Sequence, residues 1–125
     1  MAVLLDCHSM PSNAADVSGL DIVLGDRYGA SAAPAVVETL EGSLRGAGYR
    51  VRRNKPFAGG FITEHFGAPA EGAHAVQIEI ARSLYLDERR IVRTENWTGL
   101  REDLFAAAKT LAQEFGGETG RLAAE

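Results

Sequence analysis

The sequence has little cysteine, no long apolar run and no excess of basic charge. Cys7 is the one cysteine among 125 residues, which excludes an intrachain disulfide. No apolar run approaches the ~20 residues that cross a bilayer, and the start of the chain lacks the basic and apolar regions of a signal peptide. Asp and Glu outnumber Lys and Arg by 17 to 13, a net charge of -4 that disfavours nucleic-acid and anionic-membrane binding. We therefore expect a protein of the reducing cytoplasm, with no nucleic-acid and no membrane partner.

The length and the apolar content are those of one globular domain. Hydrophobic residues make up 46% of the chain and charged residues 24%, both near the average for folded domains. A chain of 125 residues is long enough for one hydrophobic core. We expect one domain over residues 1–117, and a frayed tail over residues 118–125 after the glycines that follow the last apolar helix.

Hydrophobic periodicity predicts an α/β domain, with a mostly parallel or mixed sheet flanked by helices. Apolar or alternating runs predict strands at residues 3–7, 21–25, 49–53 and 73–80. Apolar residues at helical spacing predict helices at residues 32–45 and 97–115. Ser31 is the expected N-cap of the first helix, because its hydroxyl suits that position and Pro34 follows in the first turn.

Polar side chains stand where the predicted strands end, which is where sites gather in α/β sheets. They include Asp6, His8, Arg27, Asn54 and Glu79. We expect His8 and Glu79 to face one cleft.

His8 ends an apolar strand, and its imidazole has three readings: a metal ligand, a general base or a hydrogen-bonded core histidine. Asp6 lies two residues earlier on the same strand face, so its carboxylate could orient the imidazole. Cys7 points to the opposite face, and we expect it to be a small buried hydrophobe.

Glu79 lies near the end of a strand that is apolar on both sides apart from Gln77 and Glu79. A buried carboxylate pays a desolvation cost unless it is paired or functional. One interpretation is an ion pair with Arg82 or Arg27. The other is a general base that takes a proton from water.

A long connection over residues 54–72 contains Gly59 and Gly60, directly before a possible short helical turn at residues 61–66. Backbone N–H groups at such a place suit a carboxylate or an oxyanion, although a plain turn has the same sequence pattern. Arg27 is a candidate clamp for a substrate carboxylate, and the alternative is a salt bridge with Asp26 or Glu79.

The sequence carries no self-sufficient zinc motif, because neither paired cysteines nor an HExxH spacing occurs. His65 and His74 are weaker candidates for chemistry. We expect His74 to begin the last predicted strand on the face opposite to Glu79.

Four blocks together resemble the family of N-formylglutamate amidohydrolases. They are LDCHSMP at residues 5–11, DIVLGDRYG at residues 21–29, NKPFAGGFITEH at residues 54–65 and HAVQIEIARSLY at residues 74–85. Their order and their spread along the chain make the resemblance specific.

The resemblance implies part of a zinc-carboxypeptidase-like (phosphorylase/hydrolase-like) fold, and hydrolysis of N-formyl-L-glutamate to formate and glutamate in histidine breakdown. It implies that His8 is a zinc ligand and that Glu79 is the general base. It further implies that Arg27, Asn54, Gly59 and Gly60 bind an acidic acyl-amino-acid substrate. The resemblance covers the C-terminal half of the family, so the other Zn²⁺ ligands would come from a missing N-terminal half.

Three hypotheses of different kinds remain open at this point. The chain is a zinc amidohydrolase completed by another half, or a non-catalytic domain that binds acidic small molecules. The third hypothesis is a structural remnant that associates through an exposed sheet edge, with another chain or as a homo-oligomer.

Overall fold

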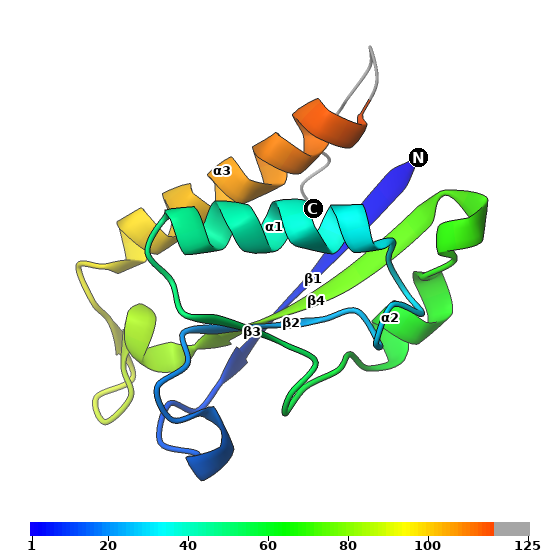
Figure 1. The fold of residues 1–125 in the computed structure, drawn as a ribbon. Helices are drawn as coiled ribbons and strands as arrows, with labels where there is room; N and C mark the ends of the chain where they lie inside the picture. Colours follow the sequence, from blue (N-terminus) through cyan, green and yellow to red (C-terminus); the bar gives the residue numbers. More distant parts are fainter. Residues whose placement is uncertain (117–125) are drawn as a thin grey trace.

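The structure, a computed structural model, describes residues 1–116, and a four-stranded mixed sheet lies at its centre (Figure 1). The strands are β1 (Ala2–Met10), β2 (Ile22–Gly25), β3 (Val51–Arg53) and β4 (Ala73–Ala81), in the spatial order β1-β4-β2-β3. β1 is parallel to β4 and β2 is parallel to β3, whereas β4 and β2 are antiparallel. This arrangement confirms the predicted α/β class with a mixed sheet. The tail expected at residues 118–125 lies outside the described residues.

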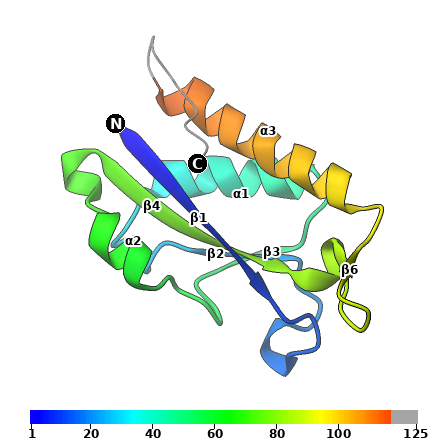
Figure 2. The same ribbon diagram turned by 180° about the vertical axis from the view of Figure 1, so that it is seen from behind.

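Two long helices cover one face of this sheet, and a short helix lies against the other (Figures 1 and 2). The long helices are α1 (Pro34–Gly46) and α3 (Trp97–Phe115), and the short one is α2 (Phe61–Phe66). The remaining elements are the 3-10 turns η1 (Ala15–Val17), η2 (Pro69–Glu71) and η3 (Arg82–Leu84) and the strands β5 (Leu86–Asp87) and β6 (Val92–Arg93). Within residues 1–116, none of the helices has the length and apolar character needed to cross a bilayer.

The main hydrophobic core fills the space between the sheet and the two long helices. α1 contributes its apolar stripe and α3 contributes Leu100 and Leu111, all of them buried. The sheet contributes alternate residues of β2 and β4, including Leu24 and Ile78. The predicted helical periodicity is confirmed, because burial of one apolar stripe is what fixes each helix on the sheet. Leu104 packs against the core only in part.

The start of α1 differs from the prediction, since Ser31 is not its N-cap. The cap position is Ala33, and no side chain of the cap residue bonds to the helix. The Ser31 hydroxyl instead donates to the carbonyl oxygen of Ala75, at 2.8 Å. The N–H of Ala33 donates to Nδ1 of His74, at 3.1 Å. A side chain from β4 therefore satisfies a backbone donor at the helix start, where a local cap was expected.

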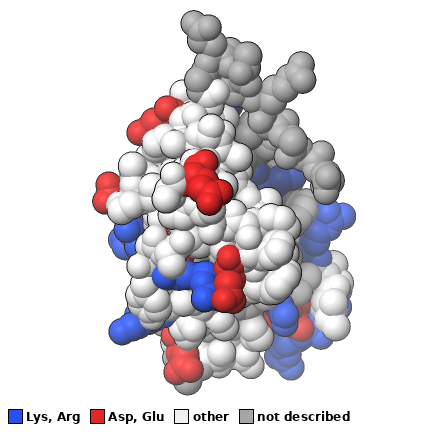
Figure 3. All heavy atoms as spheres, turned by 90° about the vertical axis from the view of Figure 1, so that its right-hand side faces the viewer, with Lys and Arg blue, Asp and Glu red and all other residues white. Residues whose placement is uncertain are grey.

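The connection between β3 and β4 is more ordered than its glycine and proline content suggests. The helical turn expected at residues 61–66 is present as α2, and η2 follows it. Figure 3 views the end of the molecule that carries these two elements, and basic and acidic side chains lie there in small mixed groups. That end therefore shows no extended field of one sign.

The antiparallel pairing of β2 with β4 changes where the strand ends lie. In a fully parallel sheet all carboxyl ends share one edge, and the candidate residues were expected to gather there. Here Val23 pairs with Glu79 and Gly25 pairs with Gln77, so β2 ends toward the start of β4. The residues that follow β2 and β3 therefore occupy the opposite end of the sheet from the ends of β1 and β4. The expectation of one shared rim was wrong for this reason.

Candidate active site

His8 and Glu79 are neighbours on the sheet face that the long helices leave uncovered. The two residues are partners in the parallel register of β1 and β4, one position beyond Cys7 and Ile78. Side chains at paired positions of adjacent strands point to the same face, and adjacent strands lie ~4.8 Å apart. Asp6 and Gln77 are paired in the same way, two positions earlier. We call Asp6, His8, Gln77 and Glu79 the polar row.

Glu79 is nearly buried, with 9% of its surface exposed, and no cation pairs with it among the described residues. Its oxygen Oε1 accepts a hydrogen bond from Nε2 of Gln77, at 2.7 Å. Arg27 and Arg82, the suggested ion-pair partners, contact Glu64 and Ser9 instead. The ion-pair interpretation of Glu79 was therefore wrong. A neutral amide donor, and not a cation, holds the carboxylate in place.

Gln77 connects Glu79 to the glycine loop, and its role was not predicted from the sequence. The N–H of Gly60 donates to Oε1 of Gln77, at 2.9 Å, and this bond fixes which end of the amide faces Glu79. The available signal was its position, two residues before Glu79 on the same strand face. The N–H of Gly60 is thereby engaged within the protein.

His8 lies at the solvent-exposed end of the polar row. Its Nε2 is 2.9 Å from Oδ2 of Asp6, and 48% of its side chain is exposed, compared with 18% for Asp6. The carboxylate of Asp6 thus fixes the orientation of the ring, as the shared strand face suggested. The ring's other nitrogen, Nδ1, forms no hydrogen bond to the described residues and is available to a ligand.

Arg27 and Asn54 meet at the other end of the sheet, after β2 and β3. Arg27 and Tyr28 both have left-handed backbone angles, with φ of 53° and 57°. Oδ1 of Asn54 accepts from the N–H groups of Asp26, at 3.0 Å, and Tyr28, at 3.4 Å, while its Nδ2 donates to Asp26 Oδ1 at 2.6 Å. These bonds hold a backbone conformation that costs roughly 1–3 kcal/mol per residue. The buried Asn54 amide thus positions the segment that carries Arg27.

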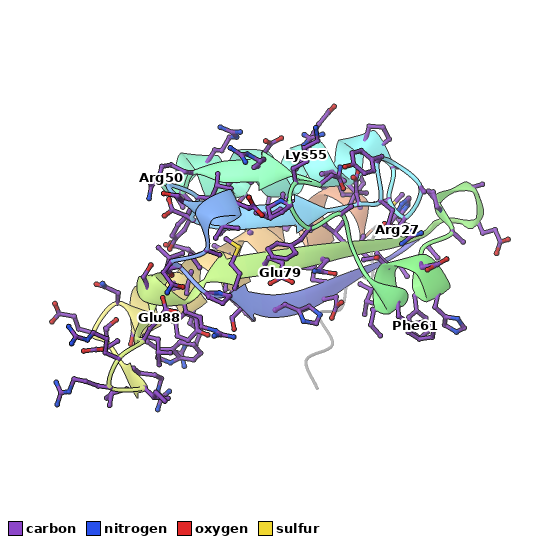
Figure 4. The ribbon with its side chains drawn as sticks, turned by 90° about the horizontal axis from the view of Figure 1, so that it is seen from below. Arg27, Arg50, Lys55, Phe61, Glu79 and Glu88 are labelled. Atoms are coloured by element: carbon purple, nitrogen blue, oxygen red, sulfur yellow. The ribbon has the colours of Figure 1, made fainter. Side chains whose placement is uncertain are left out.

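The guanidinium of Arg27 remains accessible beside α2, as Figure 4 shows from below. Its side chain is 34% exposed and lies 3.6 Å from Oε1 of the exposed Glu64, a weak surface pair. Neither Asp26 nor Glu79 pairs with it, contrary to the salt-bridge alternative. Arg27 therefore keeps donors free for an anionic ligand.

Gly25 and Gly59 allow the glycine loop to lie directly on the sheet. A Cβ on Gly25 would come within 2.7 Å of the backbone of Ala58 and Gly59. Gly59 has a φ of +113°, and a Cβ there would lie 2.4 Å from Thr63 Oγ1. The N–H of Arg27 donates to the carbonyl of Ala58, at 2.7 Å. This close contact brings Gly59 and Gly60 next to Arg27 and Gln77, so the loop joins the two ends of the site.

The remaining candidates of the sequence lie outside the polar row. Cys7 is exposed, so the expectation of a buried hydrophobe was wrong, because β1 is an edge strand and one side of this residue stays open. His74 lies on the helix-covered face, opposite to Glu79 as expected, and accepts its bond from Ala33. His65 is exposed and stacks on Phe61 within α2, with 5.2 Å between ring centres.

The donor set of the described residues fits one zinc-ligand position and not a whole site. No group of three His, Cys, Asp or Glu side chains in residues 1–116 is arranged to hold a metal ion. Catalytic zinc sites take three protein ligands. His8, oriented by Asp6, offers one imidazole next to the carboxylate of Glu79. The described residues alone therefore do not form a catalytic zinc site.

A nearly buried carboxylate beside an oriented imidazole, with an accessible guanidinium farther along the same face, is an arrangement that acid–base chemistry can use. The sequence model of the N-formylglutamate amidohydrolases matches residues 1–86. The chain belongs to this family.

Known proteins with similar sequences and structures cover more than this chain does. An N-formylglutamate deformylase of Pseudomonas putida is 43% identical over 107 residues, which are 82% of this chain and 38% of that protein. The crystal structure of an N-formylglutamate amidohydrolase from Ralstonia eutropha superposes with a TM-score of 0.84 at 35% identity, over 92% of this chain and 44% of that one. A zinc-free structure named YNDL shares the fold alone, with a TM-score of 0.51 at 20% identity over 84% of this chain and 52% of that one. The chain thus spans less than half the length of the curated relatives it matches.

Proposed function

We propose that this chain carries the general base and the substrate-carboxylate site of an N-formyl-L-glutamate hydrolase. The observation that carries the proposal is the pairing of His8 with Glu79 on the uncovered face of the sheet. The family and the relatives named as N-formylglutamate deformylase support the substrate. The reaction releases formate and L-glutamate, a step of histidine breakdown in the cytoplasm.

Glu79 acts on the water that attacks the formyl carbon. The carboxylate accepts a proton from the water as the carbon–oxygen bond forms, and it delivers that proton to the nitrogen when the amide C–N bond breaks. Gln77 holds the carboxylate through Oε1, and Oε2 accepts no hydrogen bond from the described residues. The second oxygen is therefore the one that meets the water.

The end of the site that carries Arg27 binds the acidic part of the substrate. The guanidinium takes one glutamate carboxylate, since its donors match two carboxylate oxygens. Gly59 and Gly60 shape the loop beside it, and Asn54 keeps the segment of Arg27 in its left-handed conformation. Two fixed ends of one substrate would hold its formyl group over Glu79.

His8 contributes one ligand to a Zn²⁺ ion whose other ligands lie outside the described residues. The free imidazole nitrogen and the orientation by Asp6 support this assignment. The fold shared with a protein whose structure is described as zinc-free agrees with it. When bound, zinc supplies an electrophile for the formyl carbonyl and lowers the pKa of water.

The test compares the chain alone with a reassembled enzyme. The chain is co-expressed with the part of the P. putida deformylase outside the 107 matched residues. After dialysis against a mild chelator, we expect far less than one zinc per chain for the protein alone. The complex should retain about one zinc, as catalytic sites of this class do, and should release formate from N-formyl-L-glutamate.

His8→Ala tests the ligand, and His65→Ala is its matched control because His65 is an exposed histidine of α2 that stacks on Phe61. Only His8→Ala should lower the zinc content of the complex. Stoichiometric zinc on the isolated chain would contradict the incomplete ligand set. A zinc-loaded complex that binds N-formyl-L-glutamate without hydrolysing it would replace the hydrolase with a binding domain for acidic small molecules.

A further inference from the structure

The two edges of the sheet are built in opposite ways. β3, at one edge, is three residues long and carries Arg52 and Arg53, and short charged strands are a usual protection of a sheet edge. β1, at the other edge, is nine residues long and contains no Lys, Arg or Pro. A long edge without such protection is typical of a strand that pairs with a further strand.

The outward backbone groups of β1 can be assigned from one hydrogen bond. The N–H of Ala2 donates to Gly72 on the β4 side, at 2.9 Å. Backbone groups alternate in direction along a strand, so the even-numbered residues of β1 face β4. The N–H and C=O groups of Val3, Leu5, Cys7 and Ser9 therefore point away from the sheet.

A mostly apolar groove lies beside this edge. It has a volume of about 500 Å³, runs between β1 and α3, and reaches His8 of the polar row toward the end of the strand. Its lining includes Leu5 and Cys7 of β1 and Leu104 and Phe105 of α3, and Phe105 is 60% exposed. Figure 2 shows β1 at the near edge of the sheet with α3 above it. Apolar side chains gathered along an unpaired strand mark an interaction surface.

We propose that the outer edge of β1 and this groove are the docking surface for the remainder of an amidohydrolase fold. The partner is an extended segment that pairs with β1 and places apolar side chains on Leu5, Cys7 and Phe105. More than half of the P. putida deformylase and of the R. eutropha structure lies outside the match, so relatives hold enough polypeptide to supply it. This inference rests on the proposed function, because the docked part is the source of the other zinc ligands.

Hydrogen exchange on the co-expressed complex described above tests the strand pairing. In the chain alone, the amides of Val3, Leu5 and Cys7 should exchange faster than their neighbours in β1. In the complex, the exchange of these outward amides should slow at least ~10-fold, because pairing protects strand amides from opening. Light scattering on a sizing column should give a one-to-one mass.

Phe105→Glu tests the groove, and Ile91→Glu is its matched control. Both residues are exposed hydrophobics, at 60% and 79%, and Ile91 does not line the groove. Phe105→Glu should raise the dissociation constant of the complex by at least ~10-fold, because the loss of a buried aromatic anchor weakens an interface by this much or more. Ile91→Glu should leave it unchanged. Cys7→Pro removes one outward N–H and should act like Phe105→Glu, provided that a thermal melt shows a folded chain.

The other outcomes are separable. Slow exchange in β1 of the chain alone that depends on concentration would assign the edge to a second copy and overturn the proposal. A complex that forms with unprotected β1 amides, or that tolerates Phe105→Glu, would overturn it as well, and so would folded protein that forms no complex. A complex with protected β1 amides that loads zinc but releases no formate would contradict the proposed function and leave the docking surface in place.

Discussion

Different interactions stabilise the two faces of the central sheet: mainly apolar packing on one face, and hydrogen bonds within the polar row on the other. Between the sheet and the two long helices, apolar side chains such as Leu24 and Ile78 of the strands and Leu40 of α1 are at most 2% exposed. On the other face, two hydrogen bonds hold the polar row, from Gly60 to Gln77 and from Gln77 to Glu79, and Asp6 lies 2.9 Å from His8. The first face exchanges water for close packing, which is the main source of folding free energy.

The comparison of the two faces draws attention to Glu79, a nearly buried carboxylate that has no cation partner among the described residues. A nearly buried carboxylate that receives only an amide donor is not arranged for stability, because a cation would stabilise it more. Arg82 follows Glu79 by three residues, yet it contacts Ser9, and Arg27 lies at the other end of the sheet beside Glu64. We therefore expect substitutions in the polar row to affect the proposed chemistry. Substitutions in the buried apolar clusters should affect stability, and this includes the small cluster of Met10, Val17, Val23 and Ala81 on the same face as the polar row.

Glu79→Gln should have the largest effect, on activity alone. The substitution keeps the shape of the side chain and removes the base. In the reassembled complex, kcat should fall by ~10²–10⁴-fold, the usual contribution of general base catalysis, while zinc content and the melting temperature stay near those of the wild type. Kinetics, metal analysis and a thermal melt on one preparation measure this. If the Glu79→Gln variant turned over near the wild-type rate, Glu79 would have a structural role, and the proposed division between the polar row and the apolar core would be wrong.

Leu40→Ala should have the opposite signature, because Leu40 is fully buried between α1 and the sheet. Truncation of a buried leucine lowers the free energy of unfolding by roughly 2–5 kcal/mol. Urea denaturation of the chain measures this loss. Glu38→Ala, on the exposed side of α1, is the control and should change stability by less than about 0.5 kcal/mol. Equal losses of unfolding free energy in Leu40→Ala and Glu38→Ala would show that Leu40 is not part of the hydrophobic core.

Arg27→Ala should chiefly raise KM in the reassembled enzyme. Its guanidinium is expected to contact the substrate equally before and during the reaction, so removing it weakens binding in both states. We expect a rise of ~10–100-fold in KM with kcat changed much less, as for the loss of a charged hydrogen bond. Initial rates over a range of N-formyl-L-glutamate concentrations separate the two constants. A fall in kcat with KM unchanged would move Arg27 to the reacting end of the site.

Asp21→Asn should have the smallest effect and should depend on pH. Hydrogen bonds from the Arg50 side chain hold the pKa of Asp21 below its ordinary value, against a smaller opposing effect of burial. A lowered pKa in the folded state stabilises the protein above the ordinary Asp pKa of about 3.9, and this contribution is lost as the pH falls through the folded value. Denaturation at pH 7 should show a small loss for Asp21→Asn, which disappears at about pH 2. A variant that loses as much stability in acid as at pH 7 would contradict this assignment.

Local sequence patterns predicted the positions of the helices and strands well, but they did not predict the direction in which β2 pairs with β4. The stripes of α1 and α3 and the apolar faces of β4 follow from periodicity, which is a property of the sequence itself. The antiparallel pairing of β2 with β4 depends on the path of the chain through residues 26–72, and no local pattern encodes that path. The expectation that Arg27 and Glu79 lie at the same end of the sheet was therefore wrong, although both residues face the same side of the molecule (Figure 4).

Contacts between distant residues account for the other differences in the site. Gln77 was visible as a polar residue beside Glu79, but its bond to Gly60 requires the glycine loop to lie on Gly25. The exposure of Cys7 follows from the position of β1 at the edge of the sheet, and strand order is not a property of the strand's own sequence. The register that pairs His8 with Glu79 is likewise set by the whole sheet.

The bond from Ala33 to His74 has a consequence for how the molecule opens. It ties the N-cap residue of α1 to the second residue of β4, across 41 positions of the chain. Fraying of the helix start exposes a backbone donor and frees the imidazole in the same event, so neither end unravels by itself at the usual low cost of a helix terminus. The helix start and the strand start thus form one cooperative unit. Local fluctuations that begin at either element are transmitted to the beginning of the strand on which Gln77 and Glu79 lie.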